Sequence, residues 1–141
     1  MTTNNFFVFD TNVLISAIFD FQSSSAVALS KARKQGKLLI SDDIELEYLT
    51  VFSRNKFDKW ISHKNRLDFI TNIIENSVMV EVTQHISECR DAKDNMFLSL
   101  AVSARANCIV SGDKDLLTLH PFYGISILSP IDFQLLTYFK Q

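Results

Sequence analysis

The chain has 141 residues, of which 47% are hydrophobic and 21% are charged, with only 3 Gly and 2 Pro. This composition excludes a disordered chain and predicts one compact domain over residues 1–141, built around a single core. The formal net charge of -2 excludes whole-molecule attraction as the source of affinity for nucleic acid.

Short apolar runs alternate with helical patterns along the chain. The runs that predict strands are 6–9, 37–41, 78–82, 108–111 and 125–128. The segments that predict helices are 12–19 with Asn12 as its cap, 23–35, 41–53, 65–76, 94–106, 115–119 and the segment from Pro130 onward. This alternation favours an α/β fold in which helices cover both faces of a parallel sheet.

The longest apolar segment, residues 6–19, contains Asp10 and Asn12 and has no basic leader. It therefore predicts neither a signal peptide nor a membrane span, and we expect a cytoplasmic protein. Cys89 and Cys108 lack CxxC spacing and the three His are scattered, so we predict reduced thiols in the core and no zinc cluster.

Acidic residues stand at the ends of the predicted strands and at the start of a predicted helix. Asp10 directly follows the run 6–9, Asp113 follows the strand 108–111, and Asp94 begins the helix 94–106. The carboxyl ends of parallel strands form the edge where ligands bind. Because Mg²⁺ and Mn²⁺ prefer oxygen ligands and offset the repulsion between carboxylates, this pattern predicts a divalent-metal site suited to phosphodiester chemistry.

Simpler roles exist for some of these acids. Asp94 alone is typical of a helix N-cap, and Asp113 alone is typical of a turn in which Asp115 caps the next helix. A simpler role explains Asp10 less well, because a carboxylate that follows a buried strand is costly to bury without a partner.

A fourth acid comes from the helix 41–53, where periodicity does not choose between two glutamates. Glu45 lies nearer than Glu47 to the centre of the apolar stripe of this helix. Spacing alone therefore leaves both residues open.

Basic residues concentrate in one part of the chain, because nine of the 14 Lys and Arg lie between residues 31 and 66. Within that region, residues 54–66 combine Lys56 and Lys59 with Phe57 and Trp60. Charge together with stacking favours RNA binding. A solvated face and a docking site for a partner protein are equally compatible with the pattern.

Motifs in fixed order resemble the PIN-domain family over nearly the whole chain. They are Phe-Val-Phe-Asp10-Thr-Asn12-Val-Leu-Ile, Ser41-Asp-Asp-Ile-Glu-Leu-Glu47, Asp91-Ala-Lys-Asp94-Asn-Met-Phe-Leu and Ile-Val-Ser111-Gly-Asp113-Lys-Asp115-Leu-Leu. Within the family, the chain looks most similar to the VapC-like toxin group of bacteria and archaea. The resemblance implies a three-layer α/β/α sandwich with a central parallel sheet.

The resemblance also implies a site and an activity. The implied metal-binding and catalytic acids are Asp10, Glu47, Asp94 and Asp113, and the implied supporting residues are Asn12, Ser111 and Asp115. Members of the group are metal-dependent ribonucleases, so we expect an endoribonuclease that uses Mg²⁺ or Mn²⁺. The resemblance further implies a small antitoxin partner and a homodimer.

Two other functions remain open. The segments Val-Phe-Asp10-Thr-Asn12 and Gly112-Asp113-Lys-Asp115 resemble haloacid-dehalogenase-type phosphatases, which use an Asp nucleophile and Mg²⁺. However, Asn12 stands where that mechanism requires a second Asp. The other alternative is a non-catalytic module that binds metal or RNA.

Overall fold

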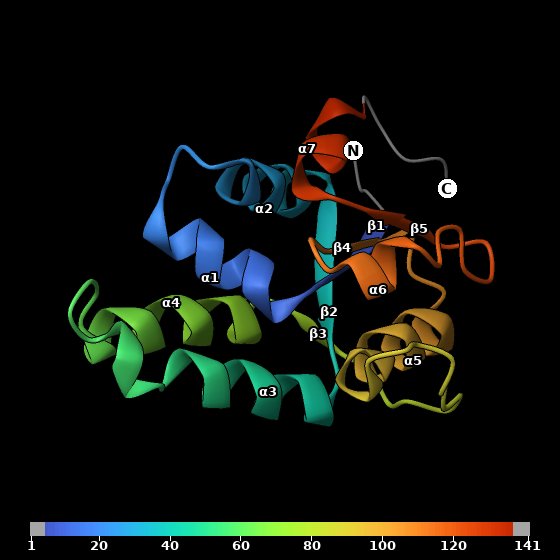
Figure 1. Cartoon of the computed structure of the whole chain (residues 1–141), viewed down its shortest axis with the longest axis horizontal. Helices are drawn as coiled ribbons and strands as arrows, with labels where there is room; N and C mark the ends of the chain where they lie inside the picture. The colour runs from blue at the N-terminus through green and yellow to red at the C-terminus, as the bar shows by residue number, and fades with distance from the viewer. Residues whose placement is uncertain (1–4, 137–141) are drawn as a thin grey trace.

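A central parallel sheet organises the protein, as the computed structural model, which describes residues 5–136, shows (Figure 1). Its strands are β1 (Asn5–Phe9), β2 (Gly36–Ile40), β3 (Val78–Met79), β4 (Cys108–Val110) and β5 (Ser126–Leu128). They lie in the order β3-β2-β1-β4-β5, and every neighbouring pair is parallel. The predicted α/β class with a parallel sheet is confirmed.

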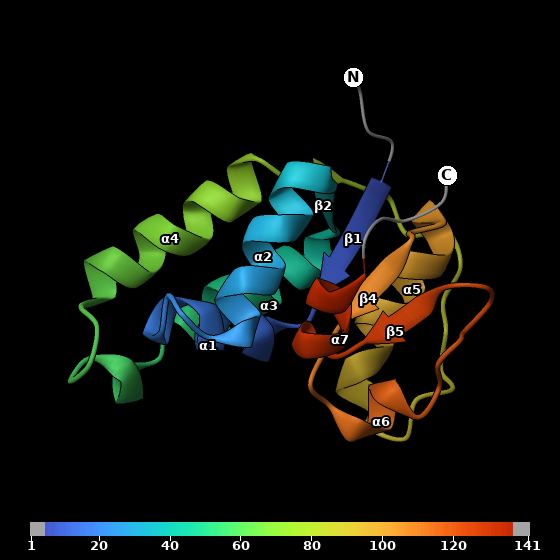
Figure 2. The ribbon, with the colours of Figure 1, turned by 90° about the horizontal axis from the view of Figure 1, so that it is seen from above.

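Helices pack on both faces of this sheet. They are α1 (Thr11–Phe19), α2 (Ser24–Gln35), α3 (Asp42–Phe52), α4 (His63–Glu75), α5 (Asn95–Ala104), α6 (Lys114–Leu117) and α7 (Pro130–Leu135). Two short 3₁₀ helices, η1 (Asn55–Phe57) and η2 (Ala92–Asp94), precede α4 and α5. Figure 1 shows α2 and α7 above the strands and α3 and α5 below them, and Figure 2 shows β4 and β5 beside β1.

The core surrounds β1, the middle strand. Phe7, Val8 and Phe9 are fully buried, and Phe7 meets Phe133 of α7 edge to face with ring centroids 5.2 Å apart. A strand buried on both faces accounts for an uninterrupted apolar run instead of alternation. The predicted core thiols, at positions 89 and 108, are buried and form no disulfide.

The observed elements differ in their bounds from several predicted ones, and two of the differences have a clear physical reason. The strand predicted at 78–82 ends at Met79, because its neighbour β2 ends at Ile40 and offers no further pairing after the bond from Val80 N to Ile40 O. The helix predicted at 94–106 ends at Ala104, because Arg105 adopts a left-handed conformation with φ of 53°. Left-handed residues commonly terminate helices.

None of the helices within residues 5–136 is by itself long and apolar enough to span a membrane. Helices α1 and α2 taken together meet that test of length and composition, but they meet at an angle of 110°.

Close approach of β1 and β2 leads to a prediction about stability. Gly36 pairs with Asn5, and a Cβ atom at position 36 would overlap the Asn5 carbonyl group. We therefore expect Gly36→Ala to lower the free energy of unfolding by about 1–3 kcal/mol through overpacking. Urea denaturation followed by circular dichroism measures the change. Gly112→Ala is the matched control, because a Cβ there meets no atom within 4 Å; equal stability of the two variants would contradict the prediction.

Candidate metal centre

Asp10 lies at the junction of β1 and α1, at the carboxyl edge of the sheet. Its side chain is 6% exposed, and the Ser111 hydroxyl donates a hydrogen bond of 2.7 Å to Asp10 Oδ2. The Asn12 backbone N–H donates to Asp10 Oδ1 at 3.4 Å, so Asp10 is the N-cap of α1. The prediction that Asn12 caps this helix is wrong, because Thr11 and Asn12 already belong to its first turn.

The pKa of the Asp10 carboxyl group is raised. Burial is the largest cause, and the charges of Asp113 and Glu47 add to it. The hydrogen bonds from Ser111 and Asn12 act in the opposite direction but do not reverse the shift. Asp10 is thus a buried acid whose ionised form is disfavoured unless a positive charge is nearby.

Glu47 approaches Asp10 from α3, which packs beside α1. The Thr11 hydroxyl donates a hydrogen bond of 3.1 Å to Glu47 Oε2. The next residue, Tyr48, is fully buried and donates from its hydroxyl to Phe9 O at 2.6 Å, which fixes α3 against the end of β1. Glu45 precedes Glu47 by two positions and so points about 200° away around the helix. The geometry places Glu47, rather than Glu45, beside Asp10.

Asp94 belongs to η2 and immediately precedes α5. Its side chain is 7% exposed and makes no capping hydrogen bond to α5, so the N-cap role does not account for its carboxylate. Burial first, and then the charge of Asp113, raise the pKa of Asp94 from its ordinary value of 3.8 to about 7. Without a cation, a substantial fraction of Asp94 is therefore protonated at neutral pH.

Asp113 follows β4 and faces the η2 acids. Its backbone N–H donates to Ser111 Oγ at 2.9 Å, and its Oδ1 accepts from the Asp115 N–H at 2.7 Å. Asp113 is therefore the N-cap of α6, and the alternative in which Asp115 caps this helix is wrong. Asp115 instead lies 3.8 Å from Arg90 Nε, measured from its Oδ1.

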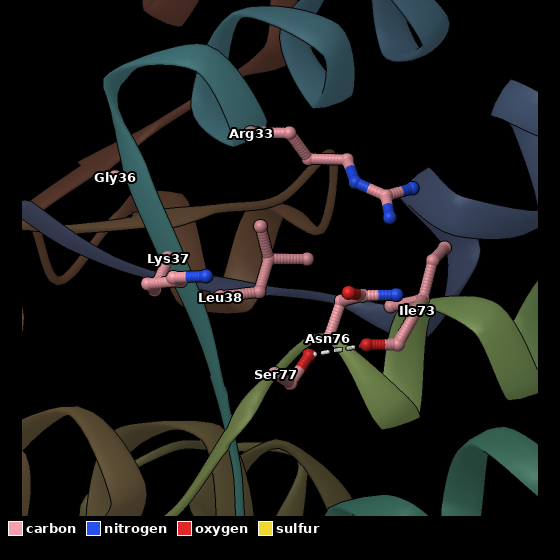
Figure 3. A pocket seen from close by; sticks show the side chains of 7 residues that line it. All are labelled: Arg33, Gly36, Lys37, Leu38, Ile73, Asn76 and Ser77. Atoms are coloured by element: carbon pink, nitrogen blue, oxygen red, sulfur yellow. Dashed lines mark hydrogen bonds between the residues drawn. The ribbon is translucent and has the colours of Figure 1, made fainter.

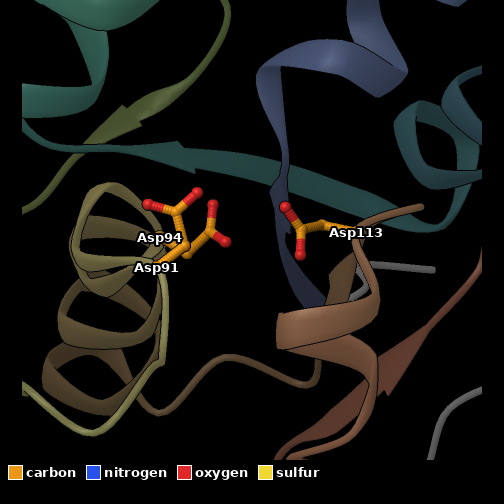
Figure 4. A group of neighbouring side chains, drawn as sticks. All are labelled: Asp91, Asp94 and Asp113. Carbon is orange, nitrogen blue, oxygen red and sulfur yellow. The ribbon is translucent and has the colours of Figure 1, made fainter.

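Sequence reasoning missed one acid of this cluster. Asp91, Asp94 and Asp113 each offer a carboxylate oxygen, and these oxygens lie within 4.8 Å of one another. Figure 4 shows Asp91 and Asp94 together on one side, with Asp113 facing them from the loop after β4. Asp91 stands three residues before Asp94, and this Asp-x-x-Asp spacing was the available signal.

The predicted acids thus come from four segments and meet at one edge. The charges of Glu47 and Asp113 act on Asp10, and the charges of Asp113 and Asp10 act on Asp94. Ser111 is fully buried and bonds to both Asp10 and Asp113, whereas the Asn12 side chain is exposed. The roles of the four predicted acids as metal ligands stay a prediction.

The donor set fits a hard divalent cation. Several carboxylates share one edge, and burial and mutual repulsion raise the pKa values of Asp10 and Asp94. A cation such as Mg²⁺ or Mn²⁺, which binds oxygen ligands, would offset that repulsion. Beside the cluster, Asp10, Asn12, Ser16 and Asp113 line an open pocket in which a substrate would meet the acids.

A different pocket lies at the beginning of β2, with Arg33, Lys37, Asn76 and Ser77 around it (Figure 3). In Figure 3 no acidic side chain lines it. Because β1 and β2 are parallel, the start of β2 lies away from the edge that carries Asp10. It is therefore separate from the metal centre.

A family model described as PIN domain matches residues 7–115. The chain therefore belongs to the PIN domain family, whose members are generally nucleases that use divalent metal ions.

The chain is also similar to individual proteins. The chain is 31% identical over 115 residues to the uncharacterized protein MJ1680 of Methanocaldococcus jannaschii, an alignment that covers 79% of this chain and 73% of that protein. Among solved structures, it is similar to PAE2754 from Pyrobaculum aerophilum, with a TM-score of 0.60, 12% identity, and coverage of 95% of this chain and 96% of that chain.

A second solved structure is VapBC2 from Rickettsia felis bound to a DNA fragment from its promoter. The TM-score is 0.59 at 13% identity, with coverage of 88% of this chain and 98% of that chain. At this identity the two structural similarities show a shared fold.

The raised pKa of Asp94 predicts a pH-dependent stability. The pKa of Asp94 in the folded protein lies above its ordinary value. The contribution of this carboxyl group to the free energy of unfolding is therefore fully present below about pH 4 and is lost as pH rises through about 7. We expect Asp94→Asn to remove this loss. In EDTA, the difference in free energy of unfolding between the variant and the wild type should therefore increase in favour of the variant from pH 5 to pH 8, by on the order of 2 kcal/mol.

Urea denaturation of both proteins across that pH range makes the measurement. Asp43→Asn, which changes an exposed acid of α3, is the control. A wild-type pH profile that Asp94→Asn leaves unchanged would show that the carboxylate is not strained by its neighbours.

Proposed function

We propose that this protein is a metal-dependent endoribonuclease that hydrolyses RNA phosphodiester bonds. The observation that carries the proposal is the convergence of Asp10, Glu47, Asp94 and Asp113 at the carboxyl edge of the sheet, with two of them nearly buried. Membership of a family of nucleases supports the reaction class. The choice of RNA rests on the resemblance of the motifs to the toxin-like group.

These four acids would hold Mg²⁺ or Mn²⁺, and Asp91 lies close enough to add a further oxygen. When bound, the cation would polarise the scissile phosphate and lower the pKa of the attacking water. The products of such hydrolysis carry a 5′-phosphate and a 3′-hydroxyl, and no side-chain nucleophile is required.

The rest of the site fixes the carboxylates in place. The Ser111 hydroxyl orients Asp10 and accepts from the backbone of Asp113, while the Thr11 hydroxyl orients Glu47. Both hydroxyl-bearing residues are buried, with exposures of 0% and 2%. Side chains held in this way lose little further freedom when a ligand binds, which favours a preorganised centre.

The phosphatase alternative has less support. The chain belongs to the PIN domain family, and position 12 carries an exposed amide instead of the second Asp which that mechanism needs. The non-catalytic alternative predicts metal-dependent stabilisation without turnover on any RNA.

The two glutamates of α3 provide a matched pair for testing the function. We expect Glu47→Gln to lower the rate of RNA cleavage by at least about 100-fold, because it removes a charge from the cluster. Glu45→Gln should cleave at nearly the wild-type rate, because that residue points away from Asp10. The measurement is gel analysis of end-labelled transfer, ribosomal and unstructured RNA with Mg²⁺ or Mn²⁺. EDTA and Asp94→Asn should also abolish cleavage. Equal activity of the two Gln variants would show that Glu47 is not part of the catalytic site.

We further propose that a small antitoxin neutralises the protein in the cytoplasm and that the protein forms a homodimer. The similarity in fold to VapBC2 supports a partner of this kind. An apolar hollow between α1, α2 and α4, lined by Ala17, Phe21, Leu29 and Phe69, has basic residues of α2 at its edge. Its apolar floor and basic edge suit an amphipathic helix with acidic flanks.

The antitoxin proposal predicts that the product of a neighbouring gene suppresses RNA cleavage when added to the purified protein. Phe21→Ala should weaken that suppression at least about fivefold in partner concentration, because Phe21 is 84% exposed at the hollow. Cleavage assays with increasing partner measure the effect. Unchanged suppression of the variant would place the partner elsewhere, and size-exclusion chromatography with light scattering tests the homodimer.

A further inference from the structure

Three aromatic side chains gather where α1 ends and where the chain continues after α3. Phe19 lies 5.5 Å from Phe57 and 6.1 Å from Trp60 between ring centroids, and the Trp60 ring is nearly perpendicular to that of Phe19. Trp60 is 63% exposed and Phe19 is 39% exposed. We call these three residues the aromatic platform. A contiguous exposed aromatic group of this kind is typical of a binding surface.

A buried arginine holds the platform in shape. Arg66 is fully buried, and its guanidinium group donates to the carbonyl oxygens of Phe52, Arg54 and Ile61. It also donates to Asp58 Oδ1 at 2.8 Å. These bonds tie the segment between α3 and α4 to the first turn of α4, so Phe57 and Trp60 project from a fixed backbone.

Two lysines lie against the platform. Lys56 Nζ is 5.2 Å from the centroid of the Phe57 ring, and Lys59 Nζ is 4.6 Å from that of Trp60. Within residues 5–136, neither lysine has a carboxylate within 4.0 Å, and the nearby Asp58 is engaged by Arg66. Both ammonium groups therefore stay available for an anionic ligand. Stacking surfaces combined with cations are the features that bind single-stranded nucleic acid.

The platform stands in line with the metal centre. Helix α1 begins beside Asp10 and ends at Phe19, a length of about 13 Å at 1.5 Å per residue. Figure 1 shows α1 and α3 extending in the same direction from the centre toward the green segment between α3 and α4. An RNA chain with one phosphate at the clustered acids would reach the platform within a few nucleotides.

We propose that the aromatic platform, together with Lys56 and Lys59, binds single-stranded RNA beside the cleavage centre. One base stacks on Trp60, and the lysines contact the phosphates that flank it. This inference rests on the proposed function for its choice of RNA. It predicts that the platform binds unpaired RNA more tightly than a duplex, because bases in a duplex are not free to stack on a protein ring.

Trp60 itself provides the first readout, because it is the single Trp in the chain. An unstructured RNA decamer is titrated into the wild-type protein in EDTA, and tryptophan fluorescence is recorded. We expect saturable quenching as a base stacks on the indole ring. The same decamer annealed to its complement should quench weakly; equal quenching by duplex and single strand would overturn the preference for unpaired RNA.

Variants provide the second readout, in which anisotropy of a labelled decamer measures affinity. Trp60→Ala should raise Kd about fivefold or more. Lys56→Ala and Lys59→Ala should each reduce the slope of log Kd against log salt by about 0.7. Tyr123→Ala is the matched control, because Tyr123 is 62% exposed and lies on the β4–β5 side of the molecule. Circular dichroism verifies that each variant is folded.

Measurement in EDTA separates this inference from the catalytic one. Quenching of the wild-type fluorescence by RNA, together with weaker binding of RNA by Trp60→Ala, would support the platform. That support would hold even if no RNA were cleaved in Mg²⁺ or Mn²⁺, although the lack of cleavage would refute the proposed nuclease. Cleavage of RNA without quenching, with wild-type affinity in Trp60→Ala, would overturn the platform and leave the nuclease intact. Quenching by a protein partner but not by RNA would also overturn it.

Discussion

Repulsion among carboxylates at the carboxyl edge of the sheet is the constraint on which the site depends. The parallel arrangement places the ends of β1 and β4 side by side, so that Asp10 and Asp113 emerge at the same edge. Packing of α3 against α1 and of α5 under the sheet adds Glu47 and Asp94. Asp10, Asp94 and Asp113 each stand at the start of a helix, and Glu47 lies within α3, which packs beside α1. The fold therefore concentrates negative charge where ligands bind in parallel sheets.

This concentration has a cost in the absence of a cation. Burial and like charges raise the pKa values of both Asp10 and Asp94. Among residues 5–136, no basic side chain forms an ion pair with either acid. The protein compensates only partly, with hydrogen bonds from neutral hydroxyl groups such as that of Ser111. Neutral donors orient a carboxylate without cancelling its charge, which leaves the cluster able to bind a metal ion.

Much of this arrangement was predictable from the sequence because it depends on local patterns. The apolar run before Asp10 and the one before Asp113 predicted strands and the edge at which both acids lie. Details that depend on neighbouring elements were not predictable. The early end of β3 depends on where β2 ends, and the choice of Asp10 and Asp113 as caps depends on side-chain geometry at two strand ends.

The glutamate and the missed aspartate illustrate the same limit. Periodicity alone did not choose between Glu45 and Glu47, because the deciding contact is a hydrogen bond from Thr11, 36 residues away. Asp91 joins the cluster because η2 turns the chain so that Asp91 and Asp94 face Asp113 together. A 3₁₀ turn of three residues has no strong sequence signature, so its effect on side-chain direction appeared only in the structure.

If the clustered acids form a divalent-cation site, calorimetric titration should detect the binding of Mn²⁺. Titration of the wild-type protein at pH 6 and pH 8, in buffers of different ionisation enthalpy, measures both binding and proton release. We expect saturable binding, with more protons released at pH 6 than at pH 8, because the pKa of Asp94 is about 7 and a metal ligand must lose its proton. Absence of binding, or binding with equal proton release at both pH values, would contradict it.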